Sequence, residues 1–223
     1  IDQGLPLVRI GTLISTPLNS LVVLRDGKIK SIADLKGKKI GFSVGGFEDA
    51  LLKAMLNKHR VKLSEVELIN INFALSPSLI SGKVDAVIGA FRNFELNQMD
   101  IVKRPGRAFY PEEHGVPPYD ELILVSHKKS LSDARLRKFL DAIESATLFI
   151  LNHPDKAWNL FTSFDKKLDD ELNRRAWRDT LARFTLRPAA LDNARYERFA
   201  SFLTRQRLIK KTLPLETYAV QLK

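Results

Sequence analysis

Short apolar runs alternate with stretches of helical hydrophobic spacing along the chain. Short runs rich in valine, isoleucine and leucine are typical of buried strands, whereas apolar residues that recur every three or four positions favour helices. The pattern predicts strands at residues 7–13, 20–26, 38–44, 66–72, 85–91 and 120–126. It predicts helices at 47–59, 76–81 and 131–152, with several more between 154 and 210. This alternation indicates an α/β fold with a mostly parallel sheet covered by helices.

The predicted elements fall into two lobes. Residues 28–119 read as a β-α-β-α-β unit, and almost everything after residue 127 reads as helix. The flanking runs SLVVLRD and DELILVS would carry the chain into and out of that unit. We therefore expect a first lobe made of residues 1–27 and 120–223, a second lobe at 28–119, and two crossing strands between them. A cleft between two such lobes is a common place for a ligand.

Composition is that of a globular protein with a substantial core. The chain has 223 residues, of which 44% are hydrophobic and 28% charged. It has no cysteine, which excludes thiolate catalysis, cysteine zinc sites, iron–sulfur clusters and disulfides. No apolar stretch is long enough to cross a bilayer and no signal peptide opens the chain. The chain begins with isoleucine rather than methionine, so we expect a preceding segment to have been removed.

The chain carries a formal net charge of +10, and its densest basic stretches are residues 173–187 and 205–211. Apolar residues recur there at helical spacing, so the basic side chains are expected on the solvated faces of helices. A nucleic-acid footprint is disfavoured because no recognition motif accompanies the charge, although a cationic surface would also suit an anionic membrane or an acidic partner. Helical spacing places seven phenylalanines in the core: Phe139, Phe149, Phe161, Phe164, Phe184, Phe199 and Phe202.

The stretch GFSVGGFEDALLKAML at residues 41–56 raises the possibility of a serine nucleophile. Gly41, Ser43 and Gly45 fit the G-x-S-x-G pattern in which a serine sits on a turn between a strand and a helix. A hydrolase of that kind needs earlier strands, an oxyanion-hole loop and a later histidine. Too few residues precede Ser43 for that, and no histidine follows His153. A ligand-facing or purely structural turn is therefore favoured over catalysis by Ser43.

Several segments resemble a known family. SIADLKGKKIGFSVGG is similar to the entry into the second lobe of type II periplasmic substrate-binding proteins. The segments PLNSLVVL, GGFEDALLKAML, SGKVDAVIGAFRNFE and RAFYPEEHGVPPYDELILV look like the NMT1/THI5-like branch, which binds thiamin pyrimidine precursors and is related to fungal pyrimidine synthases. The resemblance covers essentially the whole chain.

The resemblance implies a function and a partner. It implies a non-enzymatic solute-binding protein for an aminopyrimidine of the formylaminopyrimidine or hydroxymethylpyrimidine type, located in the periplasm or otherwise outside the cytoplasm, which delivers its ligand to the permease of an ABC importer. No cofactor and no nucleic acid are expected. Residue 1 corresponds to a point inside the first lobe, so that lobe is expected to be incomplete. The synthase alternative is disfavoured because those enzymes use a cysteine-rich iron-binding motif, and this chain has no cysteine.

Candidate ligand residues follow the ends of two predicted strands, since ligands in open parallel sheets sit beyond the carboxyl ends of the strands. Asn93 and Glu95 alternate with Arg92 and Phe94, so an extended segment would turn both polar side chains to one face. Glu95 is the preferred carboxylate, because it could accept two parallel hydrogen bonds from a 4-aminopyrimidine. The remaining candidates are Gly45, Gly46, Phe47, Glu48, Asn19, Phe91 and Tyr119.

Some of these candidates have plain structural alternatives. Gly45 and Gly46 could simply allow a tight turn before a helix. Glu48 could stabilise the start of that helix, and Asn19 could form a turn after a proline. The neighbours Glu112, Glu113 and His114 could suggest a metal site, but adjacent loop residues seldom converge on one ion without partners elsewhere, so no metal is expected.

Overall fold

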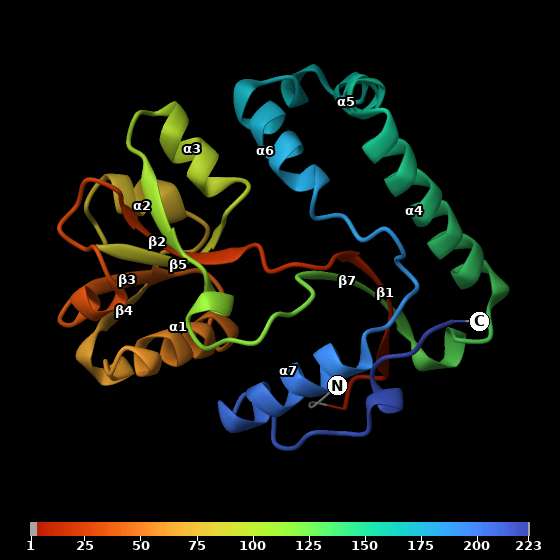
Figure 1. Ribbon diagram of the computed structural model, residues 1–223, viewed down its shortest axis with the longest axis horizontal. Coiled ribbons are helices and arrows are strands. Elements are labelled where there is room, and N and C mark those ends of the chain that lie inside the picture. The colour runs from red at the N-terminus through yellow and green to blue at the C-terminus, as the bar shows by residue number, and fades with distance from the viewer. Residues whose placement is uncertain (1–3, 223) are drawn as a thin grey trace. The chain divides into compact units, whose positions relative to one another are not determined.

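The computed structural model describes residues 4–222 and divides the chain into two compact units. One unit combines the residues up to Thr16 with those from Pro118 onward, and the other is Pro17–Pro117. Figure 1 shows the two units and labels their helices and strands except β6. No helix among residues 4–222 combines the length and apolar character needed to cross a membrane.

The Pro17–Pro117 unit is built on a five-stranded mixed sheet in the order β4-β3-β5-β2-β6. The strands are β2 (Asn19–Leu24), β3 (Lys39–Phe42), β4 (Glu67–Asn70), β5 (Ala86–Phe91) and β6 (Gly106–Phe109). β3 runs parallel to both β4 and β5, whereas β2 is antiparallel to β5 and to β6. The helices are α1 (Phe47–Lys58), α2 (Leu75–Ile80) and α3 (Glu95–Ile101), with short 3-10 turns at Ile32–Leu35, Leu63–Glu65 and Pro111–Glu113.

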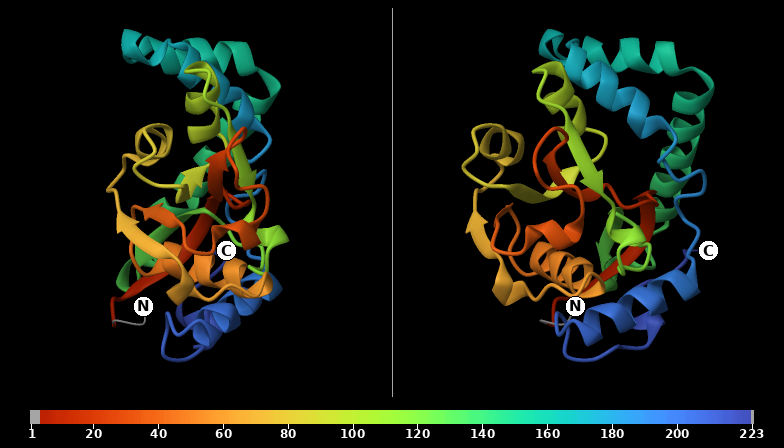
Figure 2. Two further views of the ribbon diagram at one scale, coloured as in Figure 1. Left: turned by 90° about the vertical axis from the view of Figure 1, so that its left-hand side faces the viewer. Right: turned by 60° about the vertical axis from the view of Figure 1, so that its left-hand side comes forward.

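Helices cover both faces of this sheet, α1 on one side and α2 with α3 on the other (Figures 1 and 2). The sequences NSLVVL and AVIGAF of β2 and β5 are buried along almost their whole length, as expected for central strands covered on both faces. Val22 and Val87 pack with Leu79 of α2 and Met99 of α3 in one core cluster. Burial of this apolar area supplies the main stabilisation of the unit.

The other unit pairs β1 (Leu7–Ile14) with β7 (Leu122–His127) in an antiparallel two-stranded sheet. Its helices are α4 (Ala134–Asn152), α5 (Pro154–Ser163), α6 (Glu171–Leu181) and α7 (Asn193–Arg205), with 3-10 turns at Lys128–Ser130, Lys166–Leu168 and Leu215–Thr217. Aspartate side chains accept hydrogen bonds from first-turn N–H groups at the starts of α4, α6 and α7, and Pro154 occupies the first turn of α5. These are common helix-start signals.

Three expectations about the fold need correction. The first-lobe boundary expected at residue 27 falls instead between Thr16 and Pro17, because β2 pairs with β5 and β6 and so belongs to the second unit. The sequence pattern missed α3 and β6. Phe139, Phe149 and Phe164 are exposed rather than core, with Phe164 87% accessible, because they lie on faces of α4 and beyond α5 that nothing in the described chain covers.

Candidate functional site

The candidate site lies where three inner strands of the five-stranded sheet begin or end, and we call this the candidate edge. β3 and β5 run parallel and end at Phe42 and Phe91, while β2 runs the opposite way and begins at Asn19 directly opposite Phe91. The segments that follow β3 and β5 therefore lie beside the start of β2. Most of the candidate ligand residues, all except Tyr119, fall on these three segments.

The turn after β3 is held by the side chain of Glu48. This carboxylate is 5% exposed, and its Oε2 accepts hydrogen bonds from the backbone N–H groups of Ser43 at 2.8 Å and Val44 at 3.1 Å. Asp49 accepts a further one from Gly46, whose φ of 87° is readily adopted by glycine. Glu48 thus folds back from α1 to fix the preceding turn, which goes beyond the helix-dipole role considered from sequence.

The hydroxyl of Ser43 donates a hydrogen bond to the backbone carbonyl of Asn72. A catalytic serine instead requires a general base, usually histidine, within hydrogen-bond reach of its oxygen. Within residues 4–222 the histidines have other contacts: His59 with His114, His127 with Lys129, and His153 with Phe149. The arrangement therefore gives no support to catalysis by Ser43.

Gly89 connects the turn to β2, and sequence reasoning did not select it. It is the extra residue at a bulge of β5, because Ala90 pairs with Ser20 and Ile88 with Leu21 while Gly89 has no partner of its own. Its φ is 101°, and a Cβ there would lie 2.4 Å from Oε1 of Glu48. The available signal was a glycine inside an apolar strand pattern, which often marks a bulge or a close approach.

Asn19, at the start of β2, contacts the same bulge of β5. The residue is 3% exposed, and its side-chain oxygen accepts a hydrogen bond of 3.1 Å from the backbone N–H of Gly89. Asn19, Gly89 and Glu48 therefore join the starts of β2 and α1 to the bulge of β5. The sequence suggested that Asn19 could form a turn, whereas in the structure its side chain holds β2 and β5 in register.

Arg92 is the second residue of this edge that sequence reasoning missed. Its guanidinium makes two hydrogen bonds to Glu112, at 2.6 and 2.9 Å, and stacks over the ring of Tyr110 with 4.0 Å from Cζ to the ring centroid. It also donates to the carbonyl of Asn19 at 3.2 Å. Such a bidentate pair has fixed geometry, so Arg92 anchors the Pro111–Glu113 turn to the sheet edge.

The structure changes the predicted geometry of Asn93 and Glu95. Residues 92–94 form a turn rather than an extended segment, and α3 begins at Glu95, so the alternation argument for a shared face is wrong. Asn93 is buried, and its backbone carbonyl accepts a hydrogen bond of 3.1 Å from the side chain of Asn97. Both residues still lie directly beyond the carboxyl end of β5.

Glu95 is half-buried and receives a hydrogen bond of 2.6 Å from the backbone N–H of Phe91 to its Oε2. Burial raises the pKa of the Glu95 carboxyl above its usual range, while the backbone N–H groups of Phe91 and of Glu95 itself oppose that rise. A carboxylate that is partly desolvated and held by backbone donors is a preformed acceptor for a ligand N–H group.

The aromatic candidates separate into two groups. Phe47 begins α1 and Phe91 ends β5, and both are half-buried at the candidate edge. Tyr119 belongs to the other unit, where it is 4% exposed and stacks on Phe199 with ring centroids 4.8 Å apart. Its buried position within that unit is that of a packing residue.

Two side chains of the 111–114 turn, those of Glu112 and His114, already have partners. Glu112 binds Arg92, and the two imidazoles of His114 and His59 share a hydrogen bond of 2.9 Å. Burial lowers the pKa of His114, and the neighbouring His59 lowers it further. Across residues 4–222, no three histidine or carboxylate side chains come together in a group that could hold a metal ion.

The fold is a mixed α/β fold of the kind found in periplasmic binding proteins. The chain aligns with the periplasmic aliphatic sulphonate binding protein of Escherichia coli at a TM-score of 0.75 and 16% identity, over 100% of this chain and 71% of that chain. At this level of identity the likeness establishes the fold alone.

The family follows from the sequence match. The family model described as NMT1/THI5 like matches residues 1–157, and the chain belongs to this family. It is 52% identical over 223 residues to the "Putative thiamine biosynthesis protein" of Haemophilus influenzae, a match that spans all of this chain and 71% of that protein. It is 31% identical over 171 residues to the "Formylaminopyrimidine-binding protein" of Halalkalibacterium halodurans, which covers 74% of this chain and 51% of that protein.

A more distant relative is an enzyme. The chain is 25% identical over 194 residues to the "4-amino-5-hydroxymethyl-2-methylpyrimidine phosphate synthase" of Schizosaccharomyces pombe, a match covering 82% of this chain and 56% of that protein. The chain thus spans about half the length of the binding-protein and synthase relatives. The names of these three relatives all concern thiamine or an aminopyrimidine.

Proposed function

We propose that this protein binds a small aminopyrimidine related to thiamine biosynthesis, of the formylaminopyrimidine or hydroxymethylpyrimidine type, without transforming it. The observation that carries the proposal is the 31% identity to a formylaminopyrimidine-binding protein over most of this chain. The 52% identity to a relative named for thiamine biosynthesis supports the same assignment. The periplasmic-binding-protein-like fold is consistent with a binding role.

We place the ligand at the edge formed by the ends of β3 and β5 and the start of β2. Ligands of open α/β sheets bind beyond the carboxyl ends of strands, and this edge has both a helix N-terminus and polar side chains there. In this arrangement the Glu95 carboxylate accepts a hydrogen bond from the exocyclic amino group of the pyrimidine, and Asn93 contacts the pyrimidine ring. Phe47 or Phe91 supplies an apolar surface for the ring, and Gly45 and Gly46 allow close approach of the backbone.

Asn19 and Glu48 act at this edge as positioning residues. Their buried side chains hold Gly89 and the Ser43–Val44 turn in place, so they fix the surface on which the ligand would rest. Binding to a preorganised site costs less free energy of ordering than binding to a site that must become ordered at the same time.

We further propose that the bound pyrimidine is delivered to the permease of an ABC importer, outside the cytoplasm. The support is the likeness in fold to a periplasmic binding protein. A synthase activity like that of the fungal relatives is the alternative. We favour binding because the closer of the two pyrimidine-related relatives by identity is a binding protein, and the chain has no cysteine.

A thermal-shift panel separates these possibilities. The protein is melted with formylaminopyrimidine, 4-amino-5-hydroxymethyl-2-methylpyrimidine, and an aliphatic sulfonate as a control for the fold relatives. A ligand present at a hundred times its Kd stabilises the folded protein by about 2.7 kcal/mol, which corresponds to an increase in Tm of roughly 5–10 °C. We expect that increase with a pyrimidine only. A shift with the sulfonate alone, or release of a pyrimidine product from the purified protein with iron, would contradict the proposal.

A further inference from the structure

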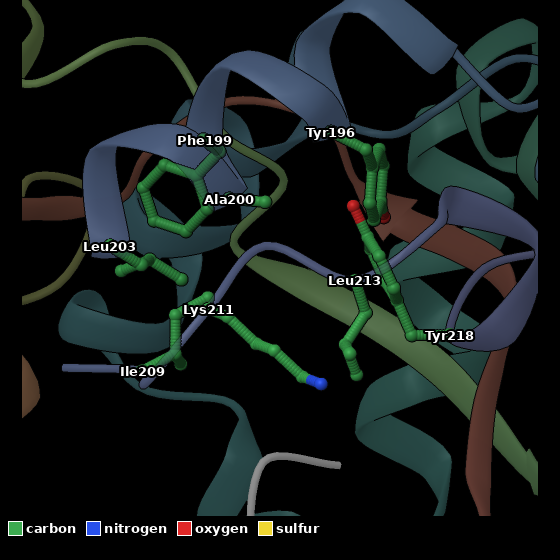
Figure 3. Close-up of a pocket in the computed structure, with 8 residues that line it drawn as sticks. All are labelled: Tyr196, Phe199, Ala200, Leu203, Ile209, Lys211, Leu213 and Tyr218. Carbon is green, nitrogen blue, oxygen red and sulfur yellow. The ribbon is translucent and has the colours of Figure 1, made fainter. Parts of the chain in front are cut away.

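A cavity lies in the unit that contains α7, and it shares no residue with the candidate pyrimidine site. Its volume is about 220 Å³, and it lies between α7 and the segment that follows it (Figure 3). Phe199, Ala200 and Leu203 line it from α7, and Ile209 and Leu213 line it from the following segment. Its walls are therefore almost wholly apolar apart from one lysine and two tyrosines.

The two tyrosines form one end of the cavity. Figure 3 shows the hydroxyl ends of Tyr196 and Tyr218 close together, away from the ammonium group of Lys211. Tyr196 donates its hydroxyl hydrogen bond to Asp120 at 3.0 Å. Burial raises the pKa of Tyr196 to about 12 and also raises that of Tyr218, so both hydroxyls stay neutral at pH 7.

One lysine, Lys211, lies among the residues that line the cavity. The stretch RQRLIKK, expected from sequence to continue as a helix with a solvated basic face, leaves α7 at Arg205 and becomes a series of turns. It carries Arg205, Arg207, Lys210 and Lys211 with no acidic residue between them. Lys211 is exposed, and it is the residue of this stretch whose charge lines the cavity. Glu197 of α7 acts on Tyr218, at the end of the cavity where the tyrosine hydroxyls lie. An apolar pocket with one lysine at its solvated end complements an apolar body that carries a single negative charge.

We infer that this cavity binds a small organic monoanion with a compact apolar body, whose carboxylate pairs with Lys211 at the solvated end of the cavity. The size of the body follows from the volume. A cavity of about 150 Å³ in another protein accommodates benzene, so about 220 Å³ accommodates roughly nine non-hydrogen atoms. A cyclohexane or benzene ring bearing a carboxylate has this size. The ring would contact Phe199, Ala200 and Leu203 while the charged group remains at the solvated end.

The test uses cyclohexanecarboxylate and its neutral amide, which have nearly the same shape. Backbone amide shifts of the isotope-labelled protein are followed by NMR as each compound is added. For a ligand this small we expect a Kd on the order of 1 mM, with the largest shifts at residues 196–213. The acid should bind more tightly than the amide, and added salt should reduce that preference because the pairing is exposed.

Two substitutions address the two parts of the inference. Lys211→Met retains the apolar stem but removes the charge, and should weaken the acid about two- to fivefold while leaving the amide unchanged. Ala200→Phe should abolish binding of both by filling the cavity, and Leu203→Trp serves the same purpose if Ala200→Phe fails to fold. Lys167→Met, an exposed lysine of the same unit, is the matched control and should behave as the parent.

Three results would overturn the inference. One is equal affinity for the acid and the amide in the parent protein. Another is unchanged binding in a folded Ala200→Phe or Leu203→Trp protein. The third is a set of shifts confined to the exposed apolar residues of β7 and α4, such as Val125 and Phe139. None of these measurements depends on pyrimidine binding, so the two proposals stand or fall separately.

Discussion

Three carboxylates near the candidate edge illustrate how similar side chains take different roles. Glu48 is buried and holds a turn through two backbone N–H groups, and Glu112 is paired with Arg92. Glu95 accepts a hydrogen bond from the backbone N–H of Phe91 but stays half-buried, and burial raises its pKa. Of these three carboxylates, Glu95 is therefore the best placed to accept a hydrogen bond from a ligand N–H group in place of water.

The raised pKa of Glu95 predicts a specific dependence of stability on pH. A carboxyl whose pKa is higher in the folded protein than the ordinary 4.5 retains its proton longer when folded. The folded state is then favoured at low pH, and this contribution is lost as the pH rises from about 4.5 through the raised pKa. Glu95→Gln cannot titrate, so the parent should lose stability relative to the variant across that window. Urea unfolding at a series of pH values measures the difference.

The control for Glu95→Gln is Glu113→Gln, an exposed carboxylate of the same unit. Its unfolding curve should follow the parent at every pH in the window. If Glu95→Gln instead gains no stability relative to the parent as the pH rises above 4.5, the burial assigned to Glu95 is wrong. Glutamine can still accept the hydrogen bond from Phe91, so the comparison isolates the charge.

His114 should act in the opposite sense at higher pH. Burial, and then the charge of His59, lower its pKa below the ordinary 6.5. A histidine kept neutral by folding stabilises the protein above pH 6.5, and this stabilisation is lost as the pH falls through the folded-state pKa. His114 also faces Lys58, Glu112 and Glu113, of which the carboxylates oppose the shift.

His114→Gln should therefore reduce the loss of unfolding free energy between pH 7.5 and 5.5. The measurement is chemical unfolding at both values. His153→Gln, an exposed histidine of the other unit, is the control and should keep the parent's dependence. A loss as steep in His114→Gln as in the parent would show that the His59–His114 pair does not carry the effect.

At the scale of elements, the bulge of β5 determines the shape of the site. Gly89 has a φ of 101° that other residues adopt at a cost, and its Cα faces the carboxylate of Glu48. Gly89→Ala combines backbone strain with a contact of 2.4 Å, so we expect a loss of about 2–4 kcal/mol in unfolding free energy. Gly82→Ala, where φ is also positive but no atom lies within 4 Å, provides the control for strain alone.

The comparison of these two glycine variants is made by urea unfolding. Gly89→Ala should be more destabilising than Gly82→Ala, because only the former meets a buried group. Equal losses would mean that the contact between Gly89 and Glu48 relaxes easily and does not fix the site.

The elements could largely be predicted from sequence where a single pattern dominated. Apolar runs located all but one of the strands, and helical spacing located α1, α2 and α4 to within a few residues. α3 was missed because it is only seven residues long and follows a turn, and β6 because its sequence GRAF has little apolar alternation. The error at Asn93 and Glu95 has the same cause, because the turn at residues 92–94 and the start of α3 were predicted to be an extended segment.

Site residues whose roles depend on distant partners could not be predicted. The pairing of Arg92 with Glu112 joins residues 20 positions apart, and the contact of Asn19 with Gly89 joins residues 70 apart. Neither leaves a periodic signal in the sequence. Residues near strand ends could be chosen as ligand candidates from sequence, because ligands bind beyond the carboxyl ends of parallel strands and the strand boundaries were predicted.

At the scale of the whole molecule, the two units differ in how fully their apolar surface is covered. The Pro17–Pro117 unit has helices on both faces of its sheet, whereas β7 of the other unit exposes Leu122, Ile123 and Val125. The candidate pyrimidine site lies in the unit whose sheet is better covered.

Isothermal titration of the protein, expressed from its natural gene, with formylaminopyrimidine tests the central claim most directly. We predict saturable binding with one site per chain, weakened by about 1.5–3 kcal/mol in Glu95→Gln, because a hydrogen bond to a charged group is lost. Glu113→Gln should bind as the parent does. Absence of binding by the folded parent protein to formylaminopyrimidine and to 4-amino-5-hydroxymethyl-2-methylpyrimidine would contradict the proposed function, and parent-like affinity in Glu95→Gln would contradict the placement of the site.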